Sequence, residues 1–360
     1  MEMNSRLPVH GGLTPPAFIL DEDFLAPRGL CLHDEHLVVA DTASNRVRLF
    51  RKGSSAFMPV LTLGGAGNGR EGCDAGSFQY PSGVWTDGRV LIVADAWNHR
   101  VLVWNRMPGE DAAPADVVIG QPDFLQHEVN RRGLGAPPTA DSLYWPYGVW
   151  SDGQSLWISD TGNRRILYYE KIPSVNGAAA TAVIGQEGFG SRDYDPANAI
   201  WPYSVKVSRQ GEMLVADTQY HRCLYWRDWK DALTMPADHV IGQPDMEGNG
   251  ANRFRLKPSA ETLNWCYDAC FAGSGILVAD TGNSRILHFG GVTADGQMAL
   301  ALTGQSDFDS NGEASLSMKS TEDHSRHLYW PFSVSHSGGM LAVADTGKSR
   351  ILVYELNPSV

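Results

Sequence analysis

The stretch WISDTGNRRILYY (residues 157–169) recurs, with substitutions, five more times in this chain of 360 residues. Each copy has an apolar run ending in Asp, four residues that are mostly small or polar, and an Arg that opens a second apolar run. The Asp stands at positions 41, 95, 160, 217, 280 and 345, and the Arg follows five positions later every time. Self-similarity at intervals of 54 to 65 residues leaves room for about four strands and a linker, and it indicates a repeat architecture.

Three phrases make up each repeat. The quoted stretch predicts a β-hairpin, in which Gly162 and Asn163, or Gly282 and Asn283, take the positive φ angles of a tight turn. A short strand, opened by Pro in five repeats and by Cys in the fifth, precedes the hairpin, and an apolar strand ended by Gly follows it. The opening phrases are PRGL at 27, YPSGVW at 80, WPYGVW at 145, WPYSVK at 201, WCYDAC at 265 and WPFSVS at 330. Four antiparallel strands in each of six repeats predict an all-β, six-bladed β-propeller.

The two ends of the chain fit this arrangement. The sixth repeat stops after its third strand, at residues 351–354, while AFILDEDF at 17–24 resembles the fourth-strand phrase VIGQPDF. We expect the N-terminal strand to complete the sixth blade and to close the ring by non-covalent pairing. The sequence thus predicts a single propeller domain over residues 17–356, with residues 1–16 as an N-terminal extension.

The Pro-opened strand, the VADTGN hairpin and the long linker resemble the NHL repeat family of six-bladed β-propellers, over nearly the whole chain. The resemblance implies the propeller fold. It leaves the activity open, because propellers with this repeat serve as recognition platforms, as sensors and occasionally as enzymes.

Composition narrows the cellular setting. The chain has no run of about 20 apolar residues, which excludes a membrane-spanning helix. Its first residues, MEMNSRLPVHGG, lack the features of a secretory signal, and whether such a signal was removed stays open. Five cysteines, at positions 31, 73, 223, 266 and 270, are an odd number without framework spacing. They favour reduced thiols and a cytoplasmic protein.

The net charge of the chain indicates which class of molecule it binds. A formal net charge of −12 argues against nucleic acid, whose affinity rests on basic protein surface. Basic residues do occur in NRRGLG (130–135) and NRFRLK (252–257), two short patches on an acidic body. A protein partner or a small-molecule ligand is therefore expected.

The recurring Asp and Arg are interpreted as structural, because a catalytic group is needed once and these occur six times. Asp can accept hydrogen bonds from backbone amides of a turn, and Arg can pair with a carboxylate on a neighbouring strand. Functional residues are therefore sought where the repeat is broken.

The residues that follow the opening Pro or Cys are expected to ring one mouth of the propeller axis. One interpretation is that their side chains plug the channel. The other is a shallow pocket that offers stacking and phenolic hydrogen bonds. Asp268, which replaces the Gly or Ser of other repeats, is expected to pair with Arg28 or to bind a cation. The set is Arg28, Ser82, Tyr147, Tyr203, Tyr267 and Phe332.

Two hairpin turns also depart from the pattern. They read DAWNH (95–99) and DTQYH (217–221), and their unusual residues are Trp97, His99, Tyr220 and His221. Exposed aromatic side chains are costly unless they contact something. These residues either pack against the adjacent linker or belong to a recognition face.

The two histidines raise the question of an enzyme. Peptide amidating lyase is a similar propeller, and that resemblance implies a zinc ion held by three histidines. One of them corresponds to His99 or His221, and the other two directly follow the opening Pro, where this chain has no His. Because catalytic zinc usually has three protein ligands, we predict no cofactor and no catalytic residue, and we leave a metal ion in the axial channel open.

The sequence therefore predicts a non-catalytic scaffold that binds a protein partner or small ligand at the loop-bearing face, around the axial mouth. The alternative is a lyase- or hydrolase-type enzyme that uses Asp268, Arg28 and a tyrosine in the axial pocket, with or without a metal ion. The ligand, the pathway and the oligomeric state are not encoded in any recognisable motif.

Overall fold

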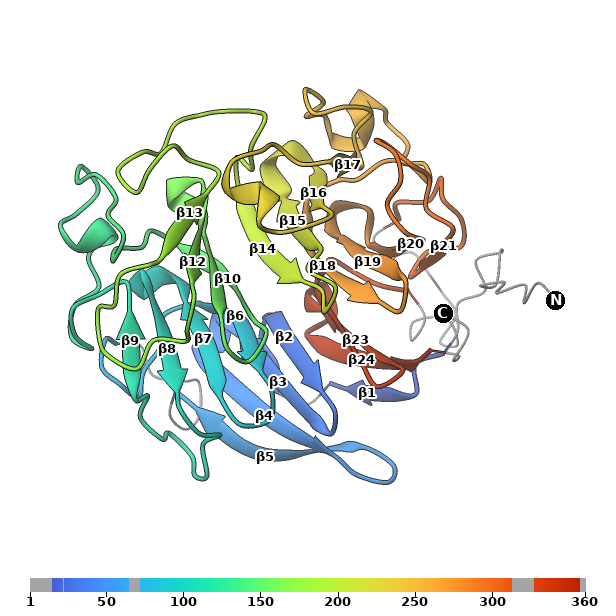
Figure 1. Cartoon of the computed structure of the whole chain (residues 1–360). Helices are drawn as coiled ribbons and strands as arrows, with labels where there is room; N and C mark the ends of the chain where they lie inside the picture. The colour runs from blue at the N-terminus through green and yellow to red at the C-terminus, as the bar shows by residue number, and fades with distance from the viewer. Residues whose placement is uncertain (1–14, 22, 65–71, 313–326, 357–360) are drawn as a thin grey trace.

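Six four-stranded antiparallel sheets surround a common axis in this protein (Figure 1). The computed structural model describes residues 15–21, 23–64, 72–312 and 327–356. Each sheet is built from strands that follow one another along the chain, and the first strands of neighbouring sheets contact each other around the axis. The predicted six-bladed β-propeller is confirmed.

The blades consist of the following strands. Blade one contains β2 (Pro27–His33), β3 (His36–Asp41), β4 (Arg46–Lys52) and β5 (Phe57–Leu63). Blade two contains β6 (Pro81–Thr86), β7 (Leu91–Asp95), β8 (Arg100–Trp104) and β9 (Val117–Ile119). Blade three contains β10 (Pro146–Ser151), β11 (Leu156–Asp160), β12 (Arg165–Tyr169) and β13 (Ala182–Ile184). Blade four contains β14 (Pro202–Val207), β15 (Met213–Asp217), β16 (Arg222–Trp226) and β17 (His239–Ile241).

The last two blades and the short helices complete the chain. Blade five contains β18 (Cys266–Ala272), β19 (Gly275–Asp280), β20 (Arg285–Phe289) and β21 (Ala301–Thr303). Blade six contains β22 (Pro331–Ser337), β23 (Met340–Asp345), β24 (Arg350–Glu355) and β1 (Phe18–Leu20). The hairpins hold 3₁₀ turns η1 (Thr42–Ser44), η2 (Ala96–Asn98), η4 (Thr161–Asn163), η5 (Thr218–Tyr220), η8 (Thr281–Asn283) and η9 (Thr346–Lys348). The linkers hold η3 (Val129–Arg131), η6 (Asp231–Leu233) and η7 (Ala251–Phe254).

The middle strands of each blade carry the core. In blade two, every residue of β7 and β8 is buried, because both faces of these strands pack against neighbouring blades. Continuous apolar runs such as LIV in β7 are the pattern expected of strands that are buried on both sides. The core therefore extends around the ring between the blades.

The ring closes between the first strand and the last, as predicted. β1 pairs antiparallel with β24, with Phe18 opposite Val353 and Leu20 opposite Ile351, and Figure 1 shows the two strands side by side. A second link joins blade six to blade one, since the Thr346 hydroxyl donates a hydrogen bond to the carbonyl of Pro27. Closure therefore joins segments from the two ends of the described chain.

The hairpin turns differ from the prediction. The expectation of positive φ at Gly162 and Asn163, and at Gly282 and Asn283, is wrong, because these residues form 3₁₀ turns. Gly162 is required for space instead, since a Cβ there would lie 2.5 Å from the ring of Tyr144. The positive φ falls on the fourth residue after each Asp, namely Asn45, His99, Arg164, His221, Ser284 and Ser349.

The repeated Asp and Arg connect each hairpin to the linkers on both sides of it. In blade three, Asp160 accepts hydrogen bonds from the Tyr144 amide and from Arg165 Nε, each at 2.7 Å. Arg165 also donates to the carbonyls of Phe189, at 2.6 Å, and Thr139, at 2.9 Å. The pair thus fixes the preceding and the following linker to one buried centre, which agrees with the structural interpretation.

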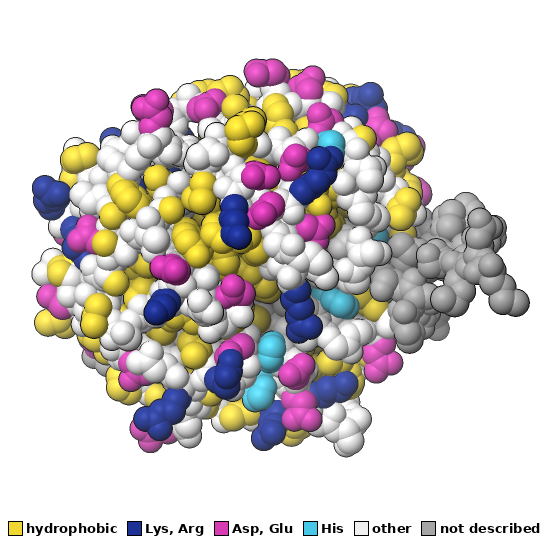
Figure 2. Space-filling view, viewed as in Figure 1, with side chains coloured by type: hydrophobic (Ala, Val, Ile, Leu, Met, Phe, Trp, Pro, Cys, Tyr) yellow, Lys and Arg dark blue, Asp and Glu magenta, His cyan; other side chains and the backbone are white. Residues whose placement is uncertain are grey.

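One arginine of each basic sequence patch is ion-paired within the fold. Arg131 pairs with Asp141 and donates to the Gly177 carbonyl, while Arg253 pairs with Glu261 at 3.5 Å. Figure 2 shows basic and acidic side chains interspersed across one face of the molecule.

Among the described residues, no helix has the length and hydrophobicity that crossing a bilayer requires.

Candidate functional site

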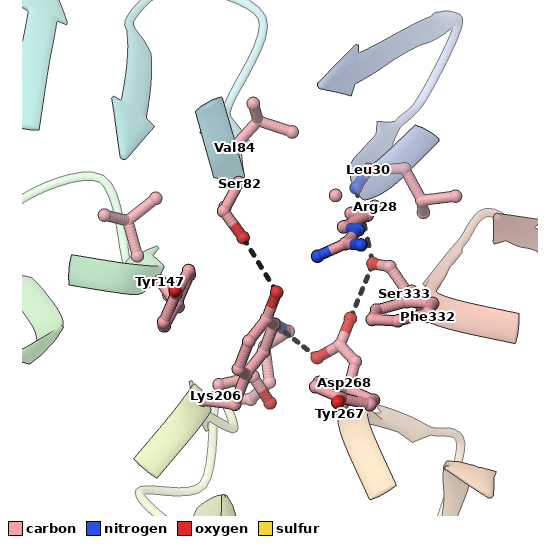
Figure 3. A pocket seen from close by; sticks show the side chains of 16 residues that line it. Arg28, Leu30, Ser82, Val84, Tyr147, Lys206, Tyr267, Asp268, Phe332 and Ser333 are labelled. Carbon is pink, nitrogen blue, oxygen red and sulfur yellow. Dashed lines mark hydrogen bonds and ion pairs between the residues drawn. The ribbon is translucent and has the colours of Figure 1, made fainter. Parts of the chain in front are cut away.

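A β-bulge follows the opening residue of every inner strand. In blade three, Pro146 pairs with Asp160 and Gly148 pairs with Ser159, so Tyr147 has no partner in the ladder. The same irregularity occurs in the other five blades. Bulges re-aim side chains, and here they direct six side chains to one axial cavity (Figure 3). We call these six the axial ring: Arg28, Ser82, Tyr147, Tyr203, Tyr267 and Phe332.

The members of the axial ring contact one another around the mouth. Tyr147 stacks on Tyr203 with 4.6 Å between ring centroids, and Tyr267 stacks on Phe332 at 4.3 Å. Tyr203 meets Tyr267 edge to face at 4.7 Å. Burial raises the pKa of Tyr267 to about 12 and also raises the pKa of Tyr203. Their hydroxyls are therefore protonated hydrogen-bond donors at neutral pH.

The inner strands approach each other closely on one side of the axis. A Cβ at Gly29 would lie 1.8 Å from the Ser82 carbonyl oxygen, and Gly83 and Gly148 are similarly confined. The equivalent residues of blades four, five and six carry side chains: Ser204, Asp268 and Ser333. Polar groups beneath the axial ring are therefore concentrated on the side of these three blades.

Asp268 pairs with a residue that sequence reasoning missed. Its carboxylate lies 3.0 Å from Lys206 Nζ and accepts a hydrogen bond from the Ser333 hydroxyl at 2.7 Å (Figure 3). It also accepts a hydrogen bond from the Val334 amide at 3.1 Å. The expected pairing with Arg28 is therefore replaced by a pairing with Lys206. Lys206 could have been found, because the equivalent residues of the other repeats carry no charge.

The cavity at the axis is small. Its volume is about 30 Å³, whereas small-molecule pockets typically occupy roughly 300–1,000 Å³. The charged residues that line it are Arg28, Lys206 and Asp268, so two cations and one anion leave one positive charge. The aromatic side chains thus fill the channel, as the packing interpretation expects, and leave a positive mouth above it.

A second set of aromatic side chains surrounds this mouth. Five of them directly precede the opening residue of an inner strand, and Trp97 joins them from a hairpin turn. Trp97 lies 4.8 Å from Tyr80 and 6.5 Å from Trp145, measured between ring centroids, and Trp145 lies 6.2 Å from Trp201. We call this set the aromatic rim: Tyr80, Trp97, Trp145, Trp201, Trp265 and Trp330.

Four side chains of the rim are exposed to solvent, which the sequence alone does not show. The exposed fraction is 46% for Trp97, 46% for Trp265, 43% for Trp330 and 39% for Tyr80. Tryptophan recurs at one repeat position, a pattern that inter-blade packing would also produce, but Trp265 and Trp330 keep nearly half of their surface in solvent. The rim therefore offers apolar surface around the axial mouth.

His99 and His221 are buried and hold the backbone of the next blade. His99 Nδ1 accepts a hydrogen bond from the Trp145 amide at 3.2 Å, and His221 Nδ1 accepts one from the Trp265 amide at 2.8 Å. Burial lowers the pKa of both histidines to about 4, so both are neutral at pH 7. Tyr220 is also buried, with the Arg222 guanidinium over its ring. Of the four unusual turn residues, Trp97 alone presents a large exposed surface.

Metal ligands do not converge in the part of the chain that the structure describes: no group of three or more His, Cys, Asp or Glu side chains there could hold a metal ion. The absence of a catalytic zinc stays a prediction, which elemental analysis of the purified protein would test. All five cysteines are free thiols, and four of them are buried.

The fold defines the class of protein: a six-bladed β-propeller. The chain matches no protein-family model and no curated protein. A crystal structure of Raptor from Chaetomium thermophilum superimposes on 97% of this chain and 29% of that chain, with a TM-score of 0.52 and 13% identity. A computationally designed protein, Ika8, covers 92% of this chain and 71% of its own, with a TM-score of 0.43 and 8% identity. The likeness to Raptor, of which this chain spans less than a third, bears on the fold alone.

Proposed function

We propose that this protein is an NHL-type propeller that acts as a non-catalytic recognition scaffold, with its binding site at the loop-bearing face around the axial mouth. The observation that carries the proposal is the exposed aromatic rim. Single exposed hydrophobic residues are common, whereas a cluster around one mouth marks an interaction site. Tryptophan and tyrosine are also the residues that contribute most binding energy at protein interfaces.

The backbone of the rim supports this proposal. Tyr80, Trp145, Trp265 and Trp330 all have φ near 50°, a conformation that costs a bulky residue about 1–3 kcal/mol and persists only where the surrounding structure holds it. In each case a side chain of the preceding blade accepts a hydrogen bond from the strained residue's amide. The acceptors are Asn45, His99, His221 and Ser284. Four side chains of three residue types thus hold four aromatic residues in one backbone conformation. This pre-organises the rim for binding.

The size of the axial cavity favours a protein partner over a small molecule or a substrate. A space of about 30 Å³ cannot enclose a typical small ligand, and Asp268 is already neutralised by Lys206. The enzyme alternative, which needs a reacting group beside Asp268, has less support than binding across the mouth. We therefore propose a protein segment as the partner, bound without a cofactor by a cytoplasmic scaffold.

A random peptide library selected on the full-length protein tests the proposal. We expect peptides that bind the wild-type protein and lose at least about thirtyfold in affinity to Trp265→Ala with Trp330→Ala, because truncating interface aromatics costs roughly 2 kcal/mol or more. The matched control replaces Met58 and Val60 of β5, which are equally apolar and each 58% exposed, by Ala. Selected peptides that bind the rim variant as tightly as the wild type would overturn the proposal.

A further inference from the structure

We infer that the centre of the mouth binds a carboxylate of the protein partner, supplied by an Asp or Glu side chain or by a C-terminus, and that Arg28 is its receptor. This inference rests on the proposed function and names the chemistry of the same site. It starts from Arg28, an exposed arginine on the inner strand of blade one. No ion pair of Arg28 with any described acidic residue is present.

The Arg28 side chain is placed where an anionic group of a partner can reach its guanidinium. Its guanidinium lies over the ring of Phe332, 4.8 Å from the centroid, and Figure 3 shows it pointing into the middle of the axial ring. A cation held over an aromatic face keeps its charge and has its plane oriented. Lys206, the other cation of the cavity, differs because Asp268 already neutralises it. Arg28 is therefore the source of the net positive charge at the mouth.

Neutral donors surround this charge. Ser82 Oγ lies 3.3 Å from the Tyr203 hydroxyl, so the two groups share a hydrogen bond. Aromatic rings flank these groups, and a hydrogen bond to a charged partner is stronger than one between two neutral groups. An anion that enters the mouth meets one guanidinium and several hydroxyl groups.

The chemistry favours a carboxylate over a phosphate. The planar fork of an arginine matches the two oxygens of a carboxylate, and a carboxylate carries one negative charge against the single uncompensated positive charge of the cavity. A phosphate monoester carries about −1.5 to −2 at neutral pH, so it would leave negative charge unpaired close to Asp268. The cavity is also small, with a volume of about 30 Å³, which suits the smaller group.

Matched peptides on the full-length protein test the inference. Peptides selected for dependence on the aromatic rim are synthesised with each carboxylate in turn changed to its amide, and with phosphoserine in place of each Asp or Glu. We expect one carboxylate per peptide whose amide binds at least about tenfold more weakly to the wild-type protein. With Arg28→Gln this preference should fall to within about twofold. It should persist with Arg51→Gln, which removes an exposed arginine from the same blade.

The outcomes separate this inference from the proposed function. Rim-dependent peptides whose carboxylate preference survives Arg28→Gln would overturn the role of Arg28 and leave the scaffold in place. Phosphoserine peptides that bind more tightly than their Glu counterparts would overturn the carboxylate and assign the site to phosphate. A library without any rim-dependent binder would overturn both proposals. Urea unfolding of the Arg28 variant confirms that it is folded when binding is measured.

Discussion

Asp95 and Arg100 form an ion pair with 2.7 Å between Oδ2 and Nε, and neither side chain has any exposed surface. Arg100 also donates to the carbonyls of Phe124 at 2.6 Å and Ser77 at 3.0 Å. The same pairing recurs in the other five blades. One arginine with several donors thus connects blade two to the linkers on both sides of it.

Arg100→Met should destabilise the protein by about 3–5 kcal/mol, because it leaves Asp95 buried without its cation. Urea unfolding followed by circular dichroism measures the free energy of unfolding. The control is Arg89→Met, which breaks the pair of Arg89 with Asp87, where the Arg89 side chain is 82% exposed. Exposed pairs contribute about 0–1 kcal/mol. An equal effect of the two substitutions would contradict the structural role of the buried pair.

Deleting residues 1–24 should destabilise the whole ring, because the deletion removes β1 and leaves the edge of β24 unpaired. It also removes Leu20 and Phe24, two buried side chains of the core between blades six and one. Since truncating one buried Leu typically costs about 2–5 kcal/mol, we expect a loss of at least that size in urea unfolding. A deletion of residues 1–15, which keeps β1, is the control. Equal unfolding midpoints for the two deletions would show that the pairing of β1 contributes nothing.

The fold could be predicted because it depends on features that repeat. Apolar runs, opening prolines and the Asp–Arg spacing occur in every blade, and the missing fourth strand of blade six has a counterpart at residues 17–24. The turn geometry could not be predicted in the same way. Its strained position is occupied by Asn45, His99, Arg164 and other residues with no common preference for positive φ. What most of them share is a side chain that accepts a hydrogen bond from the next blade, which is a tertiary property.

The site could be predicted in part. The position after the opening Pro or Cys does place the six axial-ring residues at one cavity. The partner of Asp268 was missed because Lys206 ends a strand phrase, WPYSVK, that otherwise resembles its neighbours. Trp265 and Trp330 are exposed and have a backbone φ near 50°, and recurrence of a residue in the sequence shows neither property.

Gly29→Ala should destabilise the protein by about 1–3 kcal/mol, the usual cost of forcing an added methyl group into a packed site. The added Cβ would lie 1.8 Å from the carbonyl oxygen of Ser82 on the neighbouring inner strand, so the strands around the axis would have to separate. Gly109→Ala is the matched control, since nothing lies within 4 Å of a Cβ at that position. Thermal unfolding of both variants measures the difference. Comparable stability would mean that the inner strands can move apart without cost.

Stability should fall as the pH drops below about 6.5, and His99 and His221 should account for part of the loss. Burial lowers their pKa in the folded protein to about 4, from 6.5 in the unfolded chain. Between these two values the unfolded chain binds a proton at each histidine and the folded protein does not. The free energy of unfolding therefore decreases with falling pH by about 1.4 kcal/mol per pH unit for each of them, and it is insensitive to them above pH 6.5.

The double variant His99→Asn with His221→Asn isolates this contribution, because Asn45 already performs the same task in blade one. The Asn45 amide oxygen accepts a hydrogen bond from the Tyr80 amide at 2.8 Å, as the two histidines do from Trp145 and Trp265. We expect the variant to fold at pH 7 and to lose stability more slowly between pH 6.5 and 5, by about 2.7 kcal/mol per pH unit relative to the wild type. Urea unfolding at a series of pH values measures both slopes. Parallel slopes would show that these histidines are protonated in the folded protein as readily as in the unfolded chain, and that they do not hold the rim as neutral acceptors.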